Sequence, residues 1–313
     1  MPGRGLLRRL TQAAFTILGA SVLIWALLPL APGDPAVFVL TARGNRTPVP
    51  SQIEAVRVEL GLDDPWMLQY GKWLAGLTRG ELGNSYRTGK PVTADLVTRA
   101  LPTLRLAAAA VALGAGLSLV AGLVSAAFAG RWPDHLIRLY AAAFASIPSF
   151  VLGIVLLQIV VVWSGRGSVV ADAGWGDVWL PAACLAAPIA ARWIQILRVG
   201  LLEAAGAGYH LVVAARGAGP ARLLLVHALP NALLPFMTAV GLGIVYFLTG
   251  TAVIEAVFTW PGLGLHLLHA VRDRDLPVIQ AIAVLATVGF VGMSMLVDAI
   301  ARLIDPRVGD RMA

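Results

Sequence analysis

No charged side chain occurs in Leu106-Ala-Ala-Ala-Ala-Val-Ala-Leu-Gly-Ala-Gly-Leu-Ser-Leu-Val-Ala-Gly-Leu-Val-Ser-Ala-Ala-Phe-Ala-Gly130. A helix needs about 20 mostly apolar residues to cross the hydrocarbon core of a bilayer, and this stretch is long enough. Uncharged runs of similar size occur at Leu10–Gly33, Leu139–Gly165, Leu223–Ile254 and Leu276–Val297. A sixth run, Val178–Ala191, reaches that length only if it continues through Trp193 and Leu197. We therefore predict an all-α polytopic membrane protein with six transmembrane helices.

The composition argues against a soluble protein and against a nucleic-acid partner. Of 313 residues, 58% are hydrophobic and 13% are charged, whereas about a quarter of the residues in soluble domains are charged. The net charge of +7 could indicate nucleic-acid binding, but the basic residues lie in short segments between apolar runs and do not line one face. Positive charge at the cytoplasmic ends of helices explains them better, with the lipid bilayer as the partner.

The single cysteine argues against a disulfide-stabilised or cysteine-metal protein, and the length of the N-terminal apolar run argues against a cleaved signal peptide. The single cysteine, Cys184, leaves no intramolecular disulfide framework and no cysteine-cluster metal site. Its apolar surroundings predict an inert buried thiol. The run from Leu10 to Gly33 follows Arg8 and Arg9, as in a signal peptide, but it exceeds the h-region of about 7–15 residues. We therefore expect it to be retained as the first span.

The arginines of the short connections predict the orientation, because cytoplasmic loops are enriched in Lys and Arg. Long loops cross regardless of charge, so the segment after the first span is left out of the comparison. One side carries Arg4, Arg8, Arg9, Arg131, Arg138, Arg192, Arg198, Arg216, Arg222, Arg302, Arg307 and Arg311, and the other carries Arg166, Arg272 and Arg274. Both termini are therefore expected in the cytoplasm, which agrees with an even number of spans.

The long segment after the first span is predicted to form a small helical element on the external side. Its aromatic residues, which include Trp66 and Tyr70, would not be needed in a flexible linker. Ser51 is followed three residues later by Glu54, a pattern that predicts a capping box at the start of an amphipathic helix. A second helix is expected near Asp64-Pro65, because Asp can cap a helix and Pro fits its first turn.

The predicted boundaries follow from these runs. They are a cytoplasmic N-terminus at 1–9, the first span at 10–31, an external helical segment at 32–102, the second span at 103–130, the third at 139–163, the fourth at 178–199, a cytoplasmic loop at 200–227, the fifth span at 228–254, an external loop at 255–276, the sixth span at 277–302 and a cytoplasmic C-terminus at 303–313, with the second to sixth spans as one domain over 103–302.

The segment between the fourth and fifth spans has an unusual composition. The small side chains of Val213, Ala214 and Ala215 precede a glycine, so a partner's backbone could approach this helix end closely. Gly217 and Gly219 are expected to supply left-handed conformations that end the helix, and the proline after them begins the next one. The sequence therefore predicts a helix–turn–helix knob suited to a cleft in another protein.

This knob resembles the coupling loop of binding-protein-dependent ABC importer permeases of the dipeptide, oligopeptide and nickel branch. The similar elements are Tyr209, the small residues up to Ala215, Gly217, Arg222 and His227-Ala-Leu-Pro-Asn-Ala-Leu-Leu-Pro235. Further fragments extend the resemblance over nearly the whole chain. They are Pro32-Gly-Asp-Pro35, Leu60-Gly-Leu-Asp-Asp-Pro65, Gln69-Tyr70, Trp73-Leu74, Glu81-Leu-Gly-Asn-Ser85, Pro91-Val92, Leu101-Pro-Thr-Leu104, Glu255-Ala-Val-Phe-Thr-Trp-Pro-Gly-Leu-Gly264, Arg274-Asp-Leu-Pro-Val-Ile-Gln280 and Asp305-Pro-Arg307.

The resemblance implies a multi-pass permease of the bacterial cell (inner) membrane that works by alternating access. The implied partners are a second, homologous permease, two ATP-binding subunits and a periplasmic or extracellular substrate-binding protein. It also implies contact with the ATPases through Glu203, Tyr209, Val213, Ala214, Ala215, Arg216, Gly217, Arg222 and His227, and a possible external gate at Glu255, Trp260, Pro261, Gly262 and Gly264.

Three polar residues outside the knob leave alternatives open. Glu255 is a functional candidate because it lies near membrane depth, but it could instead be an interfacial carboxylate paired with a loop arginine such as Arg272. His266 and His269 could meet on one helix face and bind nickel, which imidazole suits. Two histidines without a further ligand are more often surface residues, so no metal site is assigned.

The chain is not expected to be an enzyme or to bind a cofactor. Gly262-Leu-Gly264 lacks the Lys and Ser/Thr of a phosphate-binding loop, so ATP and Mg²⁺ are assigned to the partner subunits. An intramembrane enzyme would need catalytic groups at one membrane depth, and the spans are nearly free of ionisable side chains. The other alternative is an ion-coupled secondary transporter, which would use buried Asp or Glu or ion sites at helix breaks, without ATP.

The substrate class stays open between dipeptides or oligopeptides and nickel, free or chelated. The short loop from Arg166 to Val178 and the fragments Gln69-Tyr-Gly-Lys-Trp73 and Pro277-Val-Ile-Gln280 resemble the nickel branch slightly more than the oligopeptide branch.

Overall fold

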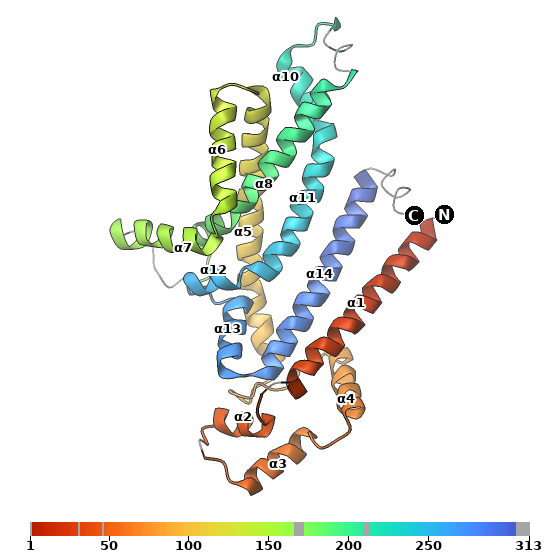
Figure 1. The fold of residues 1–313 in the computed structure, drawn as a ribbon, viewed down its shortest axis with the longest axis vertical. Helices are drawn as coiled ribbons and strands as arrows, with labels where there is room; N and C mark the ends of the chain where they lie inside the picture. Colours follow the sequence, from red (N-terminus) through yellow and green to blue (C-terminus); the bar gives the residue numbers. More distant parts are fainter. Residues whose placement is uncertain are drawn as a thin grey trace. The chain divides into compact units, whose positions relative to one another are not determined.

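The computed structural model describes residues 2–30, 32–45, 47–165, 172–208, 213 and 215–304. Within these ranges the regular structure is helical, and the one extended pairing is an isolated bridge between Asn84 and Pro91. The helices are α1 Pro2–Leu30, α2 Pro35–Ala42, α3 Pro50–Leu60, α4 Trp66–Thr78, α5 Val92–Ala127, α6 Trp132–Ser146, α7 Ser149–Leu157, the π-helix η1 Gln158–Trp163, α8 Trp179–Gly206, α10 Pro220–Arg222, the π-helix η2 Leu223–Ala228, α11 Leu229–Gly250, α12 Ala252–Val257, α13 Leu263–Asp273 and α14 Leu276–Ile304 (Figure 1).

Five helical segments of the described chain are long and apolar enough to cross a membrane. They are Arg8–Leu30, Val92–Ala127, Trp179–Gly206, Pro220–Ile244 and Leu276–Ile300. A sixth span results if α6 and the α7–η1 segment, which meet at a bend of 100°, are counted together. The prediction of an all-α polytopic membrane protein is confirmed.

The bend between α6 and α7 differs from the single continuous third span expected at 139–163. α6 begins at Trp132 and ends at Ser146, and Ile147 and Pro148 then adopt extended backbone angles. Proline has no N–H to donate to a helix, and it drives the residue before it out of helical geometry. Pro148 therefore explains where α6 stops, even though no charged residue marks the position.

Two other helices are longer than expected. α5 begins at Val92, within the segment expected to be external, and α8 continues past 199 to Gly206. As a result, the connection between α8 and α10 is confined to residues 207–219. Arg192, expected near the end of a span, instead lies in the middle of α8.

The chain divides into two compact units. The first comprises Met1–Thr103 and Pro261–Val291, and the second comprises Leu104–Trp260 and Gly292–Ala313. Two long helices, α5 and α14, belong to both units, because the boundaries after Thr103 and after Val291 fall inside them. The third boundary, after Trp260, falls between α12 and α13.

In the first unit, α2 and α3 share a small core and α4 packs on α1. Val39 and Val56 are buried at the α2–α3 contact. Tyr70 of α4 lies edge-on to Trp25 of α1, with 5.7 Å between ring centroids, and its hydroxyl is 2.9 Å from that of Ser21. The aromatic residues that indicated a folded element therefore fix α4 against the first span.

The prediction that Ser51 and Glu54 form the capping box of α3 is wrong. The helix begins at Pro50 with Val49 as its N-cap, and Gln52, not Glu54, accepts a hydrogen bond from the Val49 N–H at 3.2 Å. Proline is pre-organised for the first helical position, so Pro50 takes the helix start ahead of Ser51. The second helix starts close to the expected place, at Trp66, directly after Pro65.

The start of α14 is fixed by buried hydrogen bonds within the first unit. Asp275 accepts hydrogen bonds from the Ser85 hydroxyl and, at 3.0 Å, from the Tyr86 N–H. Gln280 donates to the carbonyls of Ile24 and Trp25 at 3.2 and 3.3 Å. Burial raises the pKa of Tyr86 to about 12, and the nearby Asp275 adds to the shift, so the phenol stays neutral.

In the second unit α8 is the central helix, packed against α6, α7, α11 and α12. Glycines on its neighbours allow the close approach. The nearest side-chain atom to an ideal Cβ would be 2.8 Å away at Gly122, from Leu197, and 2.2 Å away at Gly243, from Trp193. The indole of Trp193 also donates to the Ala239 carbonyl at 3.1 Å. Cys184 is fully buried on α8, which confirms the buried thiol.

Replacing Gly243 by alanine should destabilise the protein by about 1–3 kcal/mol, the usual cost of overpacking, because the new Cβ would collide with the Trp193 ring. Thermal unfolding in detergent, followed by the reaction of the buried Cys184 with a fluorogenic thiol reagent, measures this. Gly289→Ala is the control, since nothing lies within 4 Å of a Cβ at that position. Equal unfolding temperatures for the two variants would contradict the packing described.

Candidate functional site

The predicted coupling residues lie around the segment that joins α8 to α10. Glu203 is exposed on the last turns of α8. Val213 accepts backbone hydrogen bonds at 3.2 Å from the Arg216 N–H and at 3.4 Å from the Ala218 N–H. Tyr209 and Ala214 lie outside the described residues. Ala215, Arg216, Gly217 and Arg222 are exposed, and His227 is half-buried in η2.

Gly217 forms the turn of this segment. Its φ of +87° is in the left-handed region, which side chains with a Cβ adopt only at a cost. No atom lies within 4 Å of the place where a Cβ would be. The expected left-handed Gly217 is therefore confirmed, and the constraint is on the backbone and not on space within this chain.

The same expectation is wrong for Gly219. Its φ of −68° and ψ of 162° are extended, and it is the N-cap of α10, which Pro220 begins. One left-handed residue is enough to reverse the chain here, because Pro220 fixes the next helical φ.

A hollow of about 520 Å³ lies beside this segment. One wall comes from the end of α5 and the residue after it. The other residues come from α8, α10 and η2. The full lining is Leu123, Val124, Ala126, Ala127, Phe128, Ala205, Pro220, Ala221, Leu223, Leu224 and Leu225. The lining is almost entirely apolar, so the hollow offers shape and hydrophobic contact but no specific polar group.

A buried ion pair ties the helices next to the segment together. Arg198 of α8 donates from Nε and Nη2 to the two carboxylate oxygens of Asp134, both at 2.8 Å. Asp134 is completely buried in the first turn of α6, and it also accepts from the Ser125 hydroxyl at 2.5 Å and from the Gly130 N–H at 2.9 Å. This single carboxylate joins the end of α5, the α5–α6 turn and α8.

The sequence did not predict the cluster of Asp134, Arg198, Ser125 and Gly130. Trp132-Pro133-Asp134 carries the signal of a helix start, with a proline and an acid in the first turn. That signal locates the beginning of α6, but nothing in it indicates Arg198 as the partner, because the pair is 64 residues apart in sequence.

The candidate gate residues lie on and after α12. Glu255 is fully buried and accepts a hydrogen bond from the Thr251 hydroxyl at 3.1 Å. The loop arginine proposed as its partner, Arg272, is exposed and lies 3.4 Å from Asp273. Glu255 is therefore a carboxylate enclosed at the start of α12.

The residues after α12 have an unusual backbone. Thr259 has a φ of +48°, which is an outlier for a β-branched residue and a sign of strain held by its surroundings. The adjacent Trp260 is fully buried, and its N–H donates to the Glu255 carbonyl at 2.8 Å. Strain of this kind is concentrated at functional sites, and the sequence alone did not predict it.

The rest of the gate motif belongs to the start of α13. Pro261 precedes Gly262, the N-cap of α13, and Gly264 lies in its first turn. The N–H of Leu263 donates to the Thr103 hydroxyl at 2.8 Å. The motif therefore divides into two parts, a first half that begins and ends with the buried Glu255 and Trp260 and a helix start from Pro261 to Gly264.

Residues 118–310 match the family described as "Binding-protein-dependent transport system inner membrane component". The chain belongs to this family. Residues 3–107 match the N-terminal model of the same transport-system membrane components. The chain is accordingly a permease subunit of an ABC importer and a multi-pass inner-membrane protein.

Similar proteins agree with this assignment. The chain is 32% identical over 302 residues to the glutathione transport system permease protein GsiC of Escherichia coli, which covers 96% of this chain and 97% of that protein. The GsiC protein of Pectobacterium atrosepticum is 34% identical with the same coverage.

Two solved structures share the fold. An amino acid ABC transporter crystallised with histidines covers 67% of this chain and 94% of its own, at 20% identity and a TM-score of 0.55. The methionine ABC transporter MetNI in inward-facing conformations covers 67% and 95%, at 22% identity and a TM-score of 0.54.

The two histidines considered as metal ligands lie on α13 of this permease. His266 is half-buried and His269 is exposed. Nowhere in the described ranges do three or more His, Cys, Asp or Glu side chains gather in an arrangement that could hold a metal ion. The Nε2 atom of His266 is buried and has no hydrogen-bond partner.

His266 should make the stability of the permease depend on pH. Burial lowers the pKa of His266, and the nearby Arg99 adds to this, although Asp95 and Asp275 oppose it. The pKa of His266 is therefore lower in the folded state than in the unfolded state. At pH values between these two pKa values the unfolded state binds more protons than the folded state. The stability of the protein therefore falls as the pH drops below about 6.5, the ordinary pKa of histidine. His266→Gln should weaken the loss of unfolding temperature between pH 7.5 and pH 5. The exposed His269→Gln on the same helix should leave it unchanged, and the reverse pattern would contradict the assignment.

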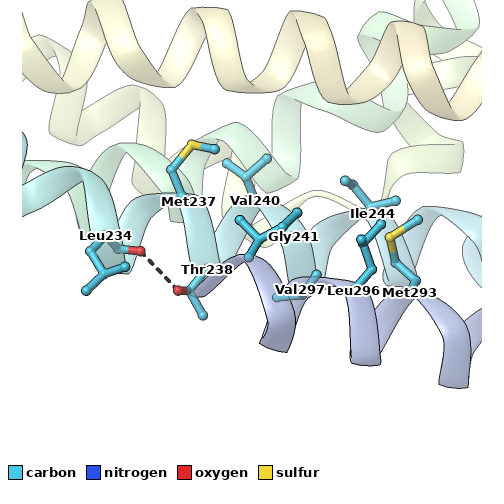
Figure 2. Close-up of a pocket in the computed structure, with 10 residues that line it drawn as sticks. Leu234, Met237, Thr238, Val240, Gly241, Ile244, Met293, Leu296 and Val297 are labelled. Atoms are coloured by element: carbon cyan, nitrogen blue, oxygen red, sulfur yellow. Dashed lines mark hydrogen bonds between the residues drawn. The ribbon is translucent and has the colours of Figure 1, made fainter. Parts of the chain in front are cut away.

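An apolar groove of about 120 Å³ runs between α11 and α14. Figure 2 shows Leu234 and Ile244 of α11 on one side and Met293 and Leu296 of α14 on the other. The one hydroxyl in the lining, of Thr238, donates to the Leu234 carbonyl at 3.0 Å. The groove therefore presents no free polar group that could select a substrate.

Proposed function

We propose that this permease imports small peptides, with the segment between α8 and α10 as its contact with separate ATPase subunits. The substrate proposal is supported by the similarity over 96% of the chain to permeases named for glutathione, a tripeptide. The coupling proposal is supported by the exposed turn at Gly217 and by the helix that leads from it into the fifth span.

In this proposal two ATPase subunits close on ATP and push on the turn at Gly217. The motion passes to α8, which precedes the turn in the chain. It also passes through α10 and η2, which follow the turn, into α11. The ion pair between Asp134 and Arg198 transmits it to α5 and α6, because the carboxylate holds all three elements. A second permease subunit and a substrate-binding protein complete the importer.

The proposed orientation places this segment and both termini in the cytoplasm. The helices α2, α3 and α4 then form the external element, and the region from Glu255 to Gly264 lies toward the outer side as a gate. ATP and Mg²⁺ bind the partner subunits, and this chain supplies the path and no catalytic group.

Uptake by cells that express the whole transporter tests the substrate proposal. We expect ATP-dependent accumulation of a labelled dipeptide, and no accumulation of labelled nickel, free or chelated. Cells that carry the transporter without this permease are the control. Accumulation of nickel in place of the dipeptide would overturn the peptide proposal and favour the nickel branch.

A further inference from the structure

The bend between α6 and α7 opens a cavity of about 230 Å³ against α8. On one side it is lined by the bend, including Ser146, Pro148 and Ser149, and on the other by α8, including Pro188 and Arg192. Its lining is far more polar than that of the groove between α11 and α14. A cavity of this size is smaller than the roughly 300–1,000 Å³ of a site for a whole ligand, so it suits one end group of a solute.

Arg192 is the charge in this cavity. It lies in the middle of α8 and is exposed, and it forms no ion pair or hydrogen bond with the described part of the chain. The other arginine of α8, Arg198, is held by Asp134 on both carboxylate oxygens. Arg192 therefore keeps its full set of donors available.

The cavity lies along two candidate membrane spans. α8 is long and apolar enough to cross a membrane, and α6 with the α7–η1 segment passes the same test as a bent pair. The bend at Ile147 is about 20 Å from Asp134 along α6, and Arg192 is about 9 Å from Arg198 along α8. Both positions are therefore well inside these spans and not at their ends.

Arg192 lies within a candidate membrane span. Charged residues within spans face the interior of the bundle or a water-filled cavity, where they mark substrate pathways. The bend adds polarity, because it interrupts the helical hydrogen bonds and leaves the last carbonyls of α6 and the first N–H groups of α7 without helical partners. The cavity is thus a polar pocket with a positive charge.

We propose that Arg192, with the hydroxyl of Ser149, binds the carboxylate of a peptide-like solute during its passage. This inference rests on the proposed function and names the chemical class of its substrate. A guanidinium binds a carboxylate through two parallel hydrogen bonds, and the Ser149 hydroxyl can donate to the same group. The hydroxyl of Ser146 already donates to the Ala142 carbonyl at 3.0 Å. A free divalent cation would be repelled from this position.

Thiol modification tests the site without knowledge of the transported solute. Ser149→Cys is introduced into a Cys184→Ala permease, which is assembled with its partner subunits in membrane vesicles without nucleotide. The thiol is treated with a negatively charged sulfonatoethyl or a positively charged trimethylammonioethyl methanethiosulfonate, and each rate is divided by the rate with a free thiol in solution.

We expect the negative reagent to react about tenfold faster than the positive one, since a unit charge a few Å away has an effect of this order. Arg192→Gln should remove the preference and Arg192→Lys should keep it. Ser146→Cys, on the other side of the bend, serves as a second reporter if Ser149→Cys does not assemble. No reaction with either reagent at both positions, or a preference that Arg192→Gln leaves unchanged, would overturn the proposal.

Protection from the same reaction tests the carboxylate. Unlabelled dialanine should slow the labelling of Ser149→Cys, and dialanine amide, which lacks the carboxylate, should slow it several-fold less. Equal protection by the two compounds, or protection by neither, would overturn the carboxylate site. Failure of the proposed function would show instead as absent dipeptide uptake by the unmodified transporter, so the two failures are distinguishable.

Discussion

Asp134→Ala should lower the free energy of unfolding of the permease by about 3–5 kcal/mol, the usual cost of breaking a buried ion pair by removing one partner. The substitution leaves Arg198, with a side chain 20% exposed, without its counter-charge. It also leaves the Ser125 hydroxyl and the Gly130 N–H without the acceptor they now share. The rate at which the buried Cys184 reacts with a thiol reagent on heating measures the loss.

A surface pair supplies the matched control. Arg43 and Glu59 are 3.2 Å apart, with side chains 49% and 55% exposed, so Glu59→Ala should change stability by less than about 1 kcal/mol. Replacing both members of the buried pair, as Asp134→Leu with Arg198→Met, should cost less than Asp134→Ala alone, because no buried charge is then left unpaired. Equal effects of Asp134→Ala and Glu59→Ala would contradict the role given to the cluster.

Gly217→Val should abolish most of the ATP-driven uptake and lower the stability of the permease by no more than the strain of one turn. A β-branched residue at a φ of +87°, which the folded chain already holds, costs about 1–3 kcal/mol of backbone strain. Where uptake requires the turn in this geometry, a cost of that size lowers it about 5- to 150-fold. The surrounding space is empty in this chain, so the membrane helices keep their packing.

Gly217→Asn is the informative partner variant, because asparagine tolerates the left-handed region far better than valine. We expect it to retain most of the uptake that valine removes. Uptake and ATP hydrolysis are measured together for both variants. Full uptake with Gly217→Val, or equal loss with both substitutions, would show that the left-handed turn is not what the coupling requires.

The membrane spans could be predicted from sequence because bilayer thickness imposes a length that uncharged runs reveal directly. The bend at Ile147 was missed for the same reason. The run from Leu139 to Gly165 is uncharged throughout, so its hydropathy predicts a single span. Pro148 is the residue that indicates the change of direction. The continuation of α8 to Gly206 was missed because charges at Arg192 and Arg198 were taken as the end of a span.

Local geometry was predicted where one residue type decides it and missed where distant residues do. Gly217 could be assigned to the left-handed region because few residues other than glycine adopt it readily. The partner of Asp134 and the positive φ of Thr259 depend on packing between helices, which no short motif records. The pocket at Arg192 depends on the bend at Pro148 meeting α8, so it too could not be read from either segment alone.

The most direct test of the account is solute uptake by proteoliposomes that contain the complete transporter. Labelled dipeptide and the binding protein are supplied on one side, and either ATP with Mg²⁺ or an ion gradient is the only energy source. The account predicts accumulation that requires ATP on the side of the ATPase subunits and is unaffected by collapsing ion gradients. Uptake driven by an ion gradient without ATP would contradict it and identify a secondary transporter.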